Sequence, residues 1–169
     1  MTRATDAIPA PFDAFRATVL PEWIDFNRHM NMGYYVVVFD LATDEWFRFV
    51  GLGADQRARE ASTTFCLEAH VTYEREVREG DPLRFTTRLL DFDAKRLHYF
   101  HEMYHATEGY LAATNELVSL HVSQVTRRAA PMDPAVLERL TRIRAAHEPL
   151  PRPSQIGRMM GLARRRPTT

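Results

Sequence analysis

Two stretches of the chain hold residue types whose spacing could do chemistry. The first, "HEMYH" at residues 101–105, fits the pattern His-Glu-x-x-His, which on a helix places two zinc-binding histidines one turn apart and is typical of zinc peptidases. On a strand the same two histidines lie about 13 Å apart, at roughly 3.3 Å per residue, which is too far to share one ion. The backbone of this segment therefore decides between a metal site and a strand.

The second stretch, "DFNRHMN" at residues 25–31, spaces Asp25, Asn27, His29 and Asn31 by two residues, directly before a long apolar segment. If that segment is a helix, its N-terminus offers unpaired backbone N–H groups and a positive potential. Such amides stabilise a developing oxyanion, and a nearby carboxylate can act as base or nucleophile toward the carbonyl. Asp25 and Asn31 could equally be ordinary turn and cap residues.

The apolar segment covers residues 32–53. Its length favours a helix over a strand, with Gly51 or Gly53 as the stop. Because the segment is apolar all round, we expect the helix to be buried. A short strand is predicted before it, within residues 15–23.

Beyond residue 61 the apolar residues follow a period of two. Residues 63–77, 83–92, 96–107 and 110–127 predict four consecutive strands, separated by turn residues and paired as an antiparallel meander. In the first of them, alternation puts Phe65, Ala69 and Val71 on one face and Glu68 on the other. "HEMYH" falls within the third strand, so no metal site is expected there.

Residues 133–148 predict an amphipathic helix, with Asp133 as its N-cap and Pro134 at its first position. The order of elements predicts an α+β domain over residues 14–148, with one antiparallel sheet wrapped around a long apolar helix and a C-terminal helix. A flexible lead-in, residues 1–13, and a basic, proline-punctuated tail, residues 149–169, flank this domain. The exposed edges and second face of such a sheet favour burial by oligomerisation.

Composition narrows the class of protein. Lys plus Arg equals Asp plus Glu, 22 each among 169 residues, without the basic excess of a dedicated nucleic-acid binder. No apolar run approaches the roughly 20 residues that cross a bilayer, and the N-terminus lacks the apolar core of a secretory signal. Cys66 is the one cysteine, so no internal disulfide can form. We expect a soluble, cytoplasmic protein that binds neither nucleic acid nor membrane.

Residues 23–34, "WIDFNRHMNMGY", resemble the signature W-x-D-x-N-x-H-(M/V)-N-x-x-Y of hotdog-fold acyl thioesterases, the 4-hydroxybenzoyl-CoA thioesterase-like superfamily. "HVTYEREVREGDPLRF" resembles the strand-turn-strand that follows the hotdog helix. "DAKRLHYFHEMYH" and "LAATNELVSLHV" resemble the betainyl-CoA thioesterase branch, which also occurs fused to carnitine dehydrogenases. The resemblance implies a hotdog fold and hydrolysis of an acyl-CoA, such as betainyl-CoA, to a free acid and CoA. Because the thioester sulfur is a good leaving group, we expect this reaction to need no metal and no redox cofactor.

The resemblance also implies catalytic roles. Asp25 matches the family's catalytic carboxylate. Asn27 and His29 match the polar pair that helps to activate water in plant acyl-carrier-protein thioesterases of this pattern. Glu68, on the polar face of the strand over residues 63–77, is a further catalytic candidate, in the same or a neighbouring subunit.

The start of the predicted helix is where the resemblance places the polarised thioester carbonyl. Asn31, the backbone N–H near Met32, and the adjoining Gly33 and Tyr34 form this substrate-binding and oxyanion region. Position 28 is commonly Gly in the signature and is Arg28 here. A cation at this position could meet the phosphate or pantetheine arm of the substrate.

Other carboxylates compete for the catalytic role, because some hotdog enzymes place the base within the helix. Asp40 and Asp44 occupy that segment, although Asp44 could instead pair with Arg48 one turn later. A betainyl group would need aromatic faces for its trimethylammonium; the candidates are Trp23, Phe26, Tyr34, Tyr35 and Trp46. Arginines near strand ends could meet CoA phosphates, namely Arg75, Arg78 and Arg96.

Two other functions remain open from the residues. A hotdog-fold enoyl-CoA hydratase usually carries Asp-x-Asn-Pro-x-His, whereas His29 here lies four residues after Asp25 and no proline follows Asn27. A non-catalytic acyl-CoA-binding module would keep the fold without needing the polar set. Hotdog domains usually assemble as dimers with sites shared across the interface, and often as tetramers, so we expect a homodimer or homotetramer.

Overall fold

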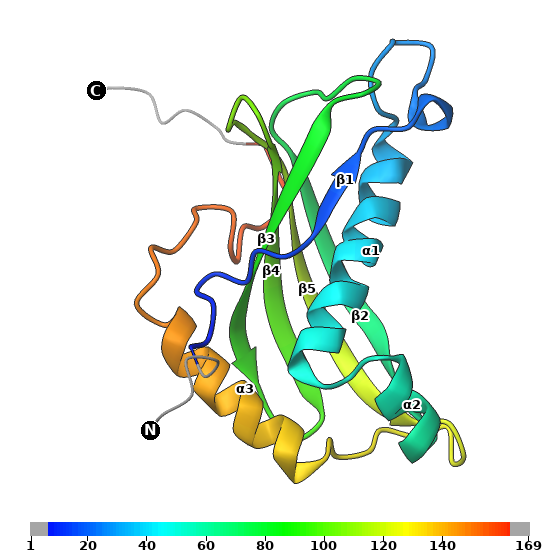
Figure 1. Ribbon diagram of the computed structural model, residues 1–169, viewed down its shortest axis with the longest axis vertical. Coiled ribbons are helices and arrows are strands. Elements are labelled where there is room, and N and C mark those ends of the chain that lie inside the picture. Colours follow the sequence, from blue (N-terminus) through cyan, green and yellow to red (C-terminus); the bar gives the residue numbers. More distant parts are fainter. Residues whose placement is uncertain (1–6, 163–169) are drawn as a thin grey trace.

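The computed structural model describes residues 7–162 and contains one antiparallel sheet that curls around a long helix (Figure 1). The five strands have the order β1-β3-β4-β5-β2. In chain order the elements are β1 Arg16–Thr18, the 3-10 helix η1 Pro21–Trp23, α1 Met32–Val50, α2 Ala54–Glu60, β2 Ser62–Tyr73, β3 Pro82–Phe92, β4 Arg96–His105, β5 Leu111–Ser123 and α3 Pro134–His147. The predicted α+β class, with a sheet around an apolar helix, is confirmed.

The central helix α1 has the predicted position and caps. Asn31 is the N-cap, with its side chain accepting a hydrogen bond from Gly33 N–H, and Gly51 ends the helix in the left-handed conformation at φ 96°. One face of α1 packs into the sheet. The opposite face is exposed and still apolar, with Met32, Val36, Val37 and Leu41 in solvent. The expectation of all-round burial is therefore wrong for the single chain.

The predicted four-strand meander is only partly correct. β3, β4 and β5 pair in sequence, but β2 pairs with β5 and lies at the far edge from β3. The connection after β2 crosses the N-terminal end of α1, where Val77 is fully buried and its carbonyl accepts from Met30 N–H at 2.9 Å. Its burial there explains why this segment is not a hairpin turn.

Strand β2 also departs from simple alternation. The register shifts between Cys66 and Glu68, so Phe65 faces Leu120 while Ala69 faces Leu117 on β5. Because β5 alternates without interruption between these positions, Phe65 and Ala69 lie on opposite faces of the sheet. A β-bulge of this kind adds one residue and reverses the pattern beyond it, so the predicted shared face is wrong.

The end of the sheet far from the α1 N-terminus is closed by α3. As predicted, this helix is capped by Asp133, whose carboxylate accepts from Ala135 N–H, and it begins with Pro134. Buried His147 ties three segments together: it accepts from Leu89 N–H at 2.9 Å and donates to the carbonyl of Pro9 at 2.8 Å. Helix α2 was not predicted.

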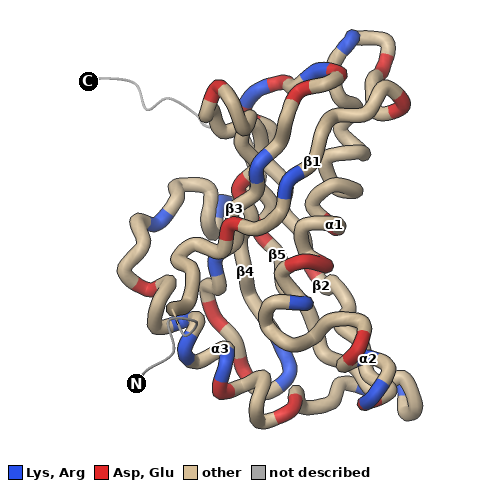
Figure 2. The backbone as a smooth tube through the Cα atoms, viewed as in Figure 1, with Lys and Arg blue, Asp and Glu red and all other residues tan. Residues whose placement is uncertain are grey.

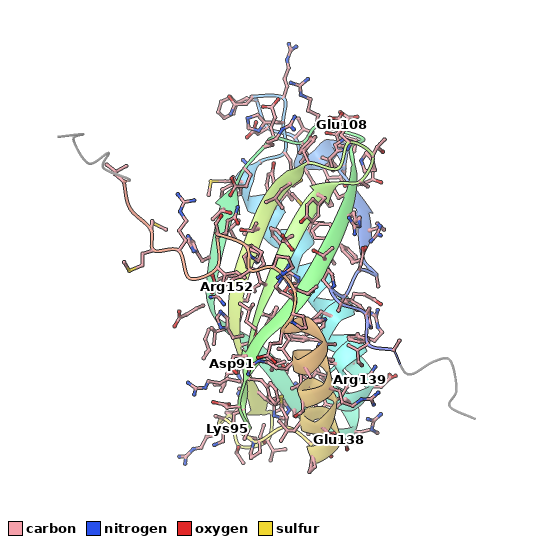
Figure 3. All side chains as sticks on the ribbon, turned by 90° about the vertical axis from the view of Figure 1, so that its left-hand side faces the viewer. Asp91, Lys95, Glu108, Glu138, Arg139 and Arg152 are labelled. Carbon is pink, nitrogen blue, oxygen red and sulfur yellow. The ribbon has the colours of Figure 1, made fainter. Side chains whose placement is uncertain are left out.

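The segment after α3 runs across the face of the sheet opposite α1, where Figure 3 labels Arg152. Arg88 donates to the carbonyl of Pro151 at 2.6 Å, and Gly157 N–H donates to Glu116 at 2.7 Å. Charges of both signs are interspersed along the chain (Figure 2). Among the described residues, no helix is long and apolar enough to cross a membrane.

Candidate functional site

The polar stretch before α1 forms a tight turn that brings its ends together. Ile24 and Met30 pair as an isolated antiparallel bridge. Within the turn, Asp25 N–H donates to the carbonyl of His29 at 3.1 Å, and Arg28 N–H donates to the carbonyl of Asp25 at 2.9 Å. Arg28 has φ 65°, in the left-handed region that glycine adopts without strain, which explains why glycine is common at this position of the signature. The turn fixes the backbone of Asp25.

The Asp25 carboxylate is linked through Asn31 to the start of α1. One oxygen of Asp25 accepts from Asn27 N–H at 2.8 Å, and the other accepts from the Asn31 side-chain NH2 at 3.4 Å. The oxygen of the same Asn31 amide accepts from Gly33 N–H at 2.9 Å. Asn31 is therefore both the helix cap and a donor to the carboxylate, and these two contacts fix its amide orientation.

The first amide of α1 stays available. No described residue accepts a hydrogen bond from Met32 N–H, whereas Gly33 N–H binds the Asn31 side chain and Tyr34 N–H binds the Asn31 carbonyl at 3.0 Å. Unpaired amides at a helix N-terminus carry positive potential and attract anions. Of the region predicted to polarise a carbonyl, Met32 N–H alone has no protein acceptor among the described residues.

His29 and Asn27 occupy different surroundings. Asn27 is exposed, and only its backbone contacts Asp25. The His29 ring contacts the carbonyl of Met30 at 3.3 Å and, with Met32, lines a cavity of about 250 Å³. His29 therefore faces a cavity that Met32 also lines, and the structure does not bring the Asn27 side chain into it.

The rival carboxylates lie away from this turn. Glu68 is exposed at the β2 bulge, five residues and roughly 17 Å along the strand from Tyr73, whose hydroxyl reaches Met32. Asp40 is eight residues into α1, about 12 Å from its start, and burial, with Asp44 beside it, raises its pKa. Asp44 lies 3.7 Å from Arg57 rather than pairing with Arg48, which binds Glu45 instead.

The aromatic candidates divide between the two ends of α1. Trp23 stacks on Tyr34, with ring centroids 6.0 Å apart, next to the turn. Tyr35 lines the cavity, and burial raises its pKa to about 12. Trp46 belongs to the buried cluster with α3 at the other end, and Phe26 is almost fully exposed.

Three residues at and just beyond the end of β2 line the same cavity and were not predicted: Tyr73, Glu74 and Glu76. Tyr73 donates from its hydroxyl to the carbonyl of Met32 at 3.3 Å. They lie some 40 residues after the turn, so only the unpredicted pairing of β2 at the sheet edge brings them here. Of the predicted arginines, Arg75 also lines the cavity, whereas Arg96 pairs with Asp93 at a distant turn.

The "HEMYH" segment lies on β4, as predicted. His101 is fully buried and is held between two hydroxyls, Thr43 on α1 and Thr87 on β3, at 2.9 and 2.8 Å. Because the Thr43 hydroxyl donates to Phe39, it accepts from His101 Nε2, which leaves Nδ1 to accept from Thr87. Within the described residues, no cluster of three or more His, Cys, Asp or Glu side chains could hold a metal ion.

Comparisons with known proteins agree with the fold and the signature. Residues 19–140 match the family model of the Thioesterase-like superfamily. The chain is 38% identical over 148 residues to a betainyl-CoA thioesterase of Pseudomonas aeruginosa, covering 88% of this chain and 93% of that protein. It is 32% identical over 154 residues to an L-carnitine dehydrogenase/betainyl-CoA thioesterase of a Rhizobium species, covering 91% of this chain but 31% of that one.

Two solved structures are also similar. A Staphylococcus aureus protein in complex with CoA superposes with a TM-score of 0.84 at 28% identity, covering 94% of this chain and all of that one. A putative thioesterase of Pseudomonas putida superposes with a TM-score of 0.79 at 30% identity, covering 92% and 99%. The similarity to both extends over nearly the whole described fold.

Proposed function

Because the chain belongs to the Thioesterase-like superfamily, we propose that the turn at residues 25–31 and the start of α1 are its active site for hydrolysing an acyl-CoA thioester. One observation carries this proposal. Asn31 links the Asp25 carboxylate to the helix N-terminus, beside the one first-turn amide that no described residue occupies. A base or nucleophile and an oxyanion donor are thus held next to each other.

In this mechanism the thioester oxygen accepts a hydrogen bond from Met32 N–H, and the helix N-terminus stabilises the charge that develops on it. Asp25 takes a proton from water as the water oxygen attacks the carbonyl carbon, or attacks that carbon itself and is released by water afterwards. The carbon–sulfur bond then breaks, and the CoA thiolate takes up a proton. The products are a carboxylic acid and CoA.

The other predicted residues support this arrangement in different ways. His29, which lines the cavity, orients water or the leaving thiolate. Asn27 gives Asp25 its backbone N–H, and Gly33 and Tyr34 complete the cap through their own N–H groups. Arg28 projects from the exposed turn and is available to the phosphate or pantetheine arm of the substrate.

We propose betainyl-CoA as the substrate. Support comes from the relatives: the Pseudomonas aeruginosa thioesterase of this name covers nearly the same length, and the Rhizobium protein carries the activity in its name as well. The structure of the similar Staphylococcus aureus protein was solved in complex with CoA, which supports a CoA thioester as the substrate here.

We also propose that the protein forms a homodimer and that two such dimers can associate as a homotetramer. β2 is an edge strand, and exposed apolar side chains on β2 and α1 adjoin it: Met32, Val36, Val37, Leu41, Phe65, Leu67 and Tyr73. A single copy leaves this surface in water, whereas a second copy buries it and pairs the edge. Glu68 lies at the bulge of the same edge strand and would enter a shared site through the partner copy. A monomer by light scattering at micromolar concentration contradicts this assembly.

The purified protein tests the reaction with a panel of acyl-CoAs that includes betainyl-, 4-hydroxybenzoyl-, crotonyl- and palmitoyl-CoA. Free thiol is measured for hydrolysis, and loss of the enoyl absorbance is measured for hydration. Saturable release of CoA, fastest from betainyl-CoA, is expected. Hydration of crotonyl-CoA without thiol release would instead identify a hydratase, and binding without turnover of any substrate would identify an acyl-CoA-binding module.

A further inference from the structure

The cavity beside Met32 has a composition that the hydrolysis of a thioester does not itself require. It holds about 250 Å³ and is lined by two tyrosines and two glutamates, Tyr35, Tyr73, Glu74 and Glu76, together with His29, Met30, Met32 and Arg75. We propose that this cavity is a quaternary-ammonium subsite, which selects an acyl group carrying a fixed positive charge. This inference rests on the proposed function and names the residues that would set its substrate.

The two tyrosines form a fixed aromatic corner. Their ring centroids lie 5.1 Å apart and their planes meet at 86°. Tyr35 is buried on α1, and the hydroxyl of Tyr73 is anchored on the Met32 carbonyl at 3.3 Å. Rings held at right angles offer electron-rich faces to a trimethylammonium group, which cannot donate hydrogen bonds and is recognised mainly by such faces.

The glutamates supply negative charge at the same place. Glu74 accepts hydrogen bonds from the neutral side chains of Thr72 and Gln155, at 3.2 and 3.1 Å. No described cation pairs with Glu74. Its charge is therefore available to a cationic ligand.

The remaining charges around the cavity are already engaged. Glu76 pairs with Arg78 at 2.7 Å, and this pairing lowers the pKa of Glu76. Arg75 also lines the cavity, and its guanidinium carbon lies 3.7 Å from the centre of the Tyr110 ring. Arg75 is thus engaged by the Tyr110 ring rather than by the glutamates of the cavity.

The position of the cavity suits a short acyl group. In a betainyl thioester a single methylene separates the carbonyl carbon from the nitrogen, a span of roughly 2.5 Å from bond lengths near 1.5 Å. The cation site must therefore adjoin the amide that holds the carbonyl oxygen. Met32 meets this demand, because its N–H is the free helix amide and its own carbonyl anchors Tyr73.

The test compares betainyl-CoA with 3,3-dimethylbutanoyl-CoA, its uncharged carbon isostere of the same shape. For the wild-type protein we expect kcat/KM at least tenfold higher for the cationic substrate. Glu74→Gln should lower this ratio about fivefold, and Tyr73→Leu should lower it similarly, while Tyr73→Phe keeps the ring and most of the preference. Loss of selection for charge lowers this ratio, whereas a structural disturbance of the helix start lowers kcat/KM for both substrates alike and leaves the ratio unchanged.

Glu138→Gln is the matched control, because Glu138 lies on α3, at the end of the sheet far from the α1 N-terminus (Figure 3). It should leave the ratio unchanged. Equal kcat/KM for the two substrates in the wild type overturns the subsite and leaves the thioesterase proposal standing. If neither is hydrolysed, calorimetric binding of both by the same protein decides: preference for the cationic thioester supports the subsite, and equal affinity overturns it.

Discussion

The turn at residues 25–31 and the centre of β4 both present histidines and polar partners, yet the fold treats them in opposite ways. In the turn, Asp25 and His29 are half-exposed, and His29 lines a cavity of about 250 Å³. At the centre of β4, His101 has no exposed surface, and both of its ring nitrogens are occupied by threonine hydroxyls. One region leaves polar groups available to a substrate, and the other uses them all within the protein.

This difference explains why the motif at residues 25–31 indicates function, whereas the motif at residues 101–105 indicates packing. A histidine whose hydrogen bonds are all satisfied by its own fold specifies packing, because any ligand would first have to displace those bonds. Burial lowers the pKa of His101 to about 3, so the ring stays neutral under ordinary conditions. The turn instead leaves Met32 N–H without an acceptor among the described residues and links the Asp25 carboxylate to the helix start through Asn31. We therefore expect the turn to govern rate and His101 to govern stability.

The largest expected effect is on rate. Asp25→Asn keeps the size of the side chain but removes the charge that activates water or attacks the carbonyl. We expect kcat to fall by about a thousandfold, since a general base or nucleophile contributes on the order of 10²–10⁴. Steady-state release of CoA measures this. A variant with more than a tenth of wild-type kcat would exclude Asp25 as the catalytic carboxylate.

The next effect is on stability. His101→Leu leaves the Thr87 hydroxyl without its acceptor in a buried site, so we expect the free energy of unfolding to fall by about 2–4 kcal/mol. Urea unfolding measures the change. Adding Thr87→Val removes the unpaired hydroxyl and should recover part of the loss. If the single variant is as stable as the wild type, the threonine contacts do not stabilise the fold.

The buried histidines also predict acid sensitivity. His101 has a folded-state pKa near 3, against an ordinary value of 6.5, and burial lowers the pKa of His147 as well. Below pH 6.5 the unfolded state takes up these protons and the folded state does not. The contribution of these histidines to the free energy of unfolding is therefore fully present above pH 6.5. It declines as the pH falls, by up to about 1.4 kcal/mol per pH unit for each histidine. Urea unfolding between pH 7.5 and 4.5 should show a shallower decline for His101→Leu.

The smallest effect separates the two duties of Asn31. Asn31→Ala removes the helix cap, which costs about 1 kcal/mol of stability, and also removes the donor to Asp25. Asn31→Asp keeps an acceptor for Gly33 N–H but cannot donate to Asp25. We expect the aspartate variant to unfold like the wild type and to lose rate like the alanine variant. Equal rates for Asn31→Asp and the wild type would show that the donor has no role.

Much of this architecture could be predicted from the sequence. The length of the apolar run and its flanking Asn31 and Gly51 predicted α1 correctly, and the period of two placed "HEMYH" on a strand. The signature ahead of α1 predicted the thioesterase family, which the family match and the relatives confirm. These features are local: each depends on caps, turns or periodicity within some 20 residues.

The features that were missed depend on distant contacts. The bulge at residues 66–68 has no local signal and reverses the faces of β2. The pairing of β2 with β5 across the sheet brings Tyr73 and Glu74 to the helix start, which alternation within β2 could not reveal. The exposed apolar face of α1 was read as core, because hydrophobicity alone does not say whether the same chain or a second copy covers a residue.

The central claim is that the turn governs rate and His101 governs stability. It is tested most directly on two variants, Asp25→Asn and His101→Leu, by measuring kcat/KM for betainyl-CoA and the free energy of unfolding in urea for each. We predict that Asp25→Asn unfolds like the wild type but has almost no activity. His101→Leu should be markedly less stable. Without urea, and at a temperature at which this variant is folded, its kcat/KM for betainyl-CoA should lie within about threefold of the wild-type value. An active Asp25→Asn protein, or a stable but inactive His101→Leu protein, would contradict this account.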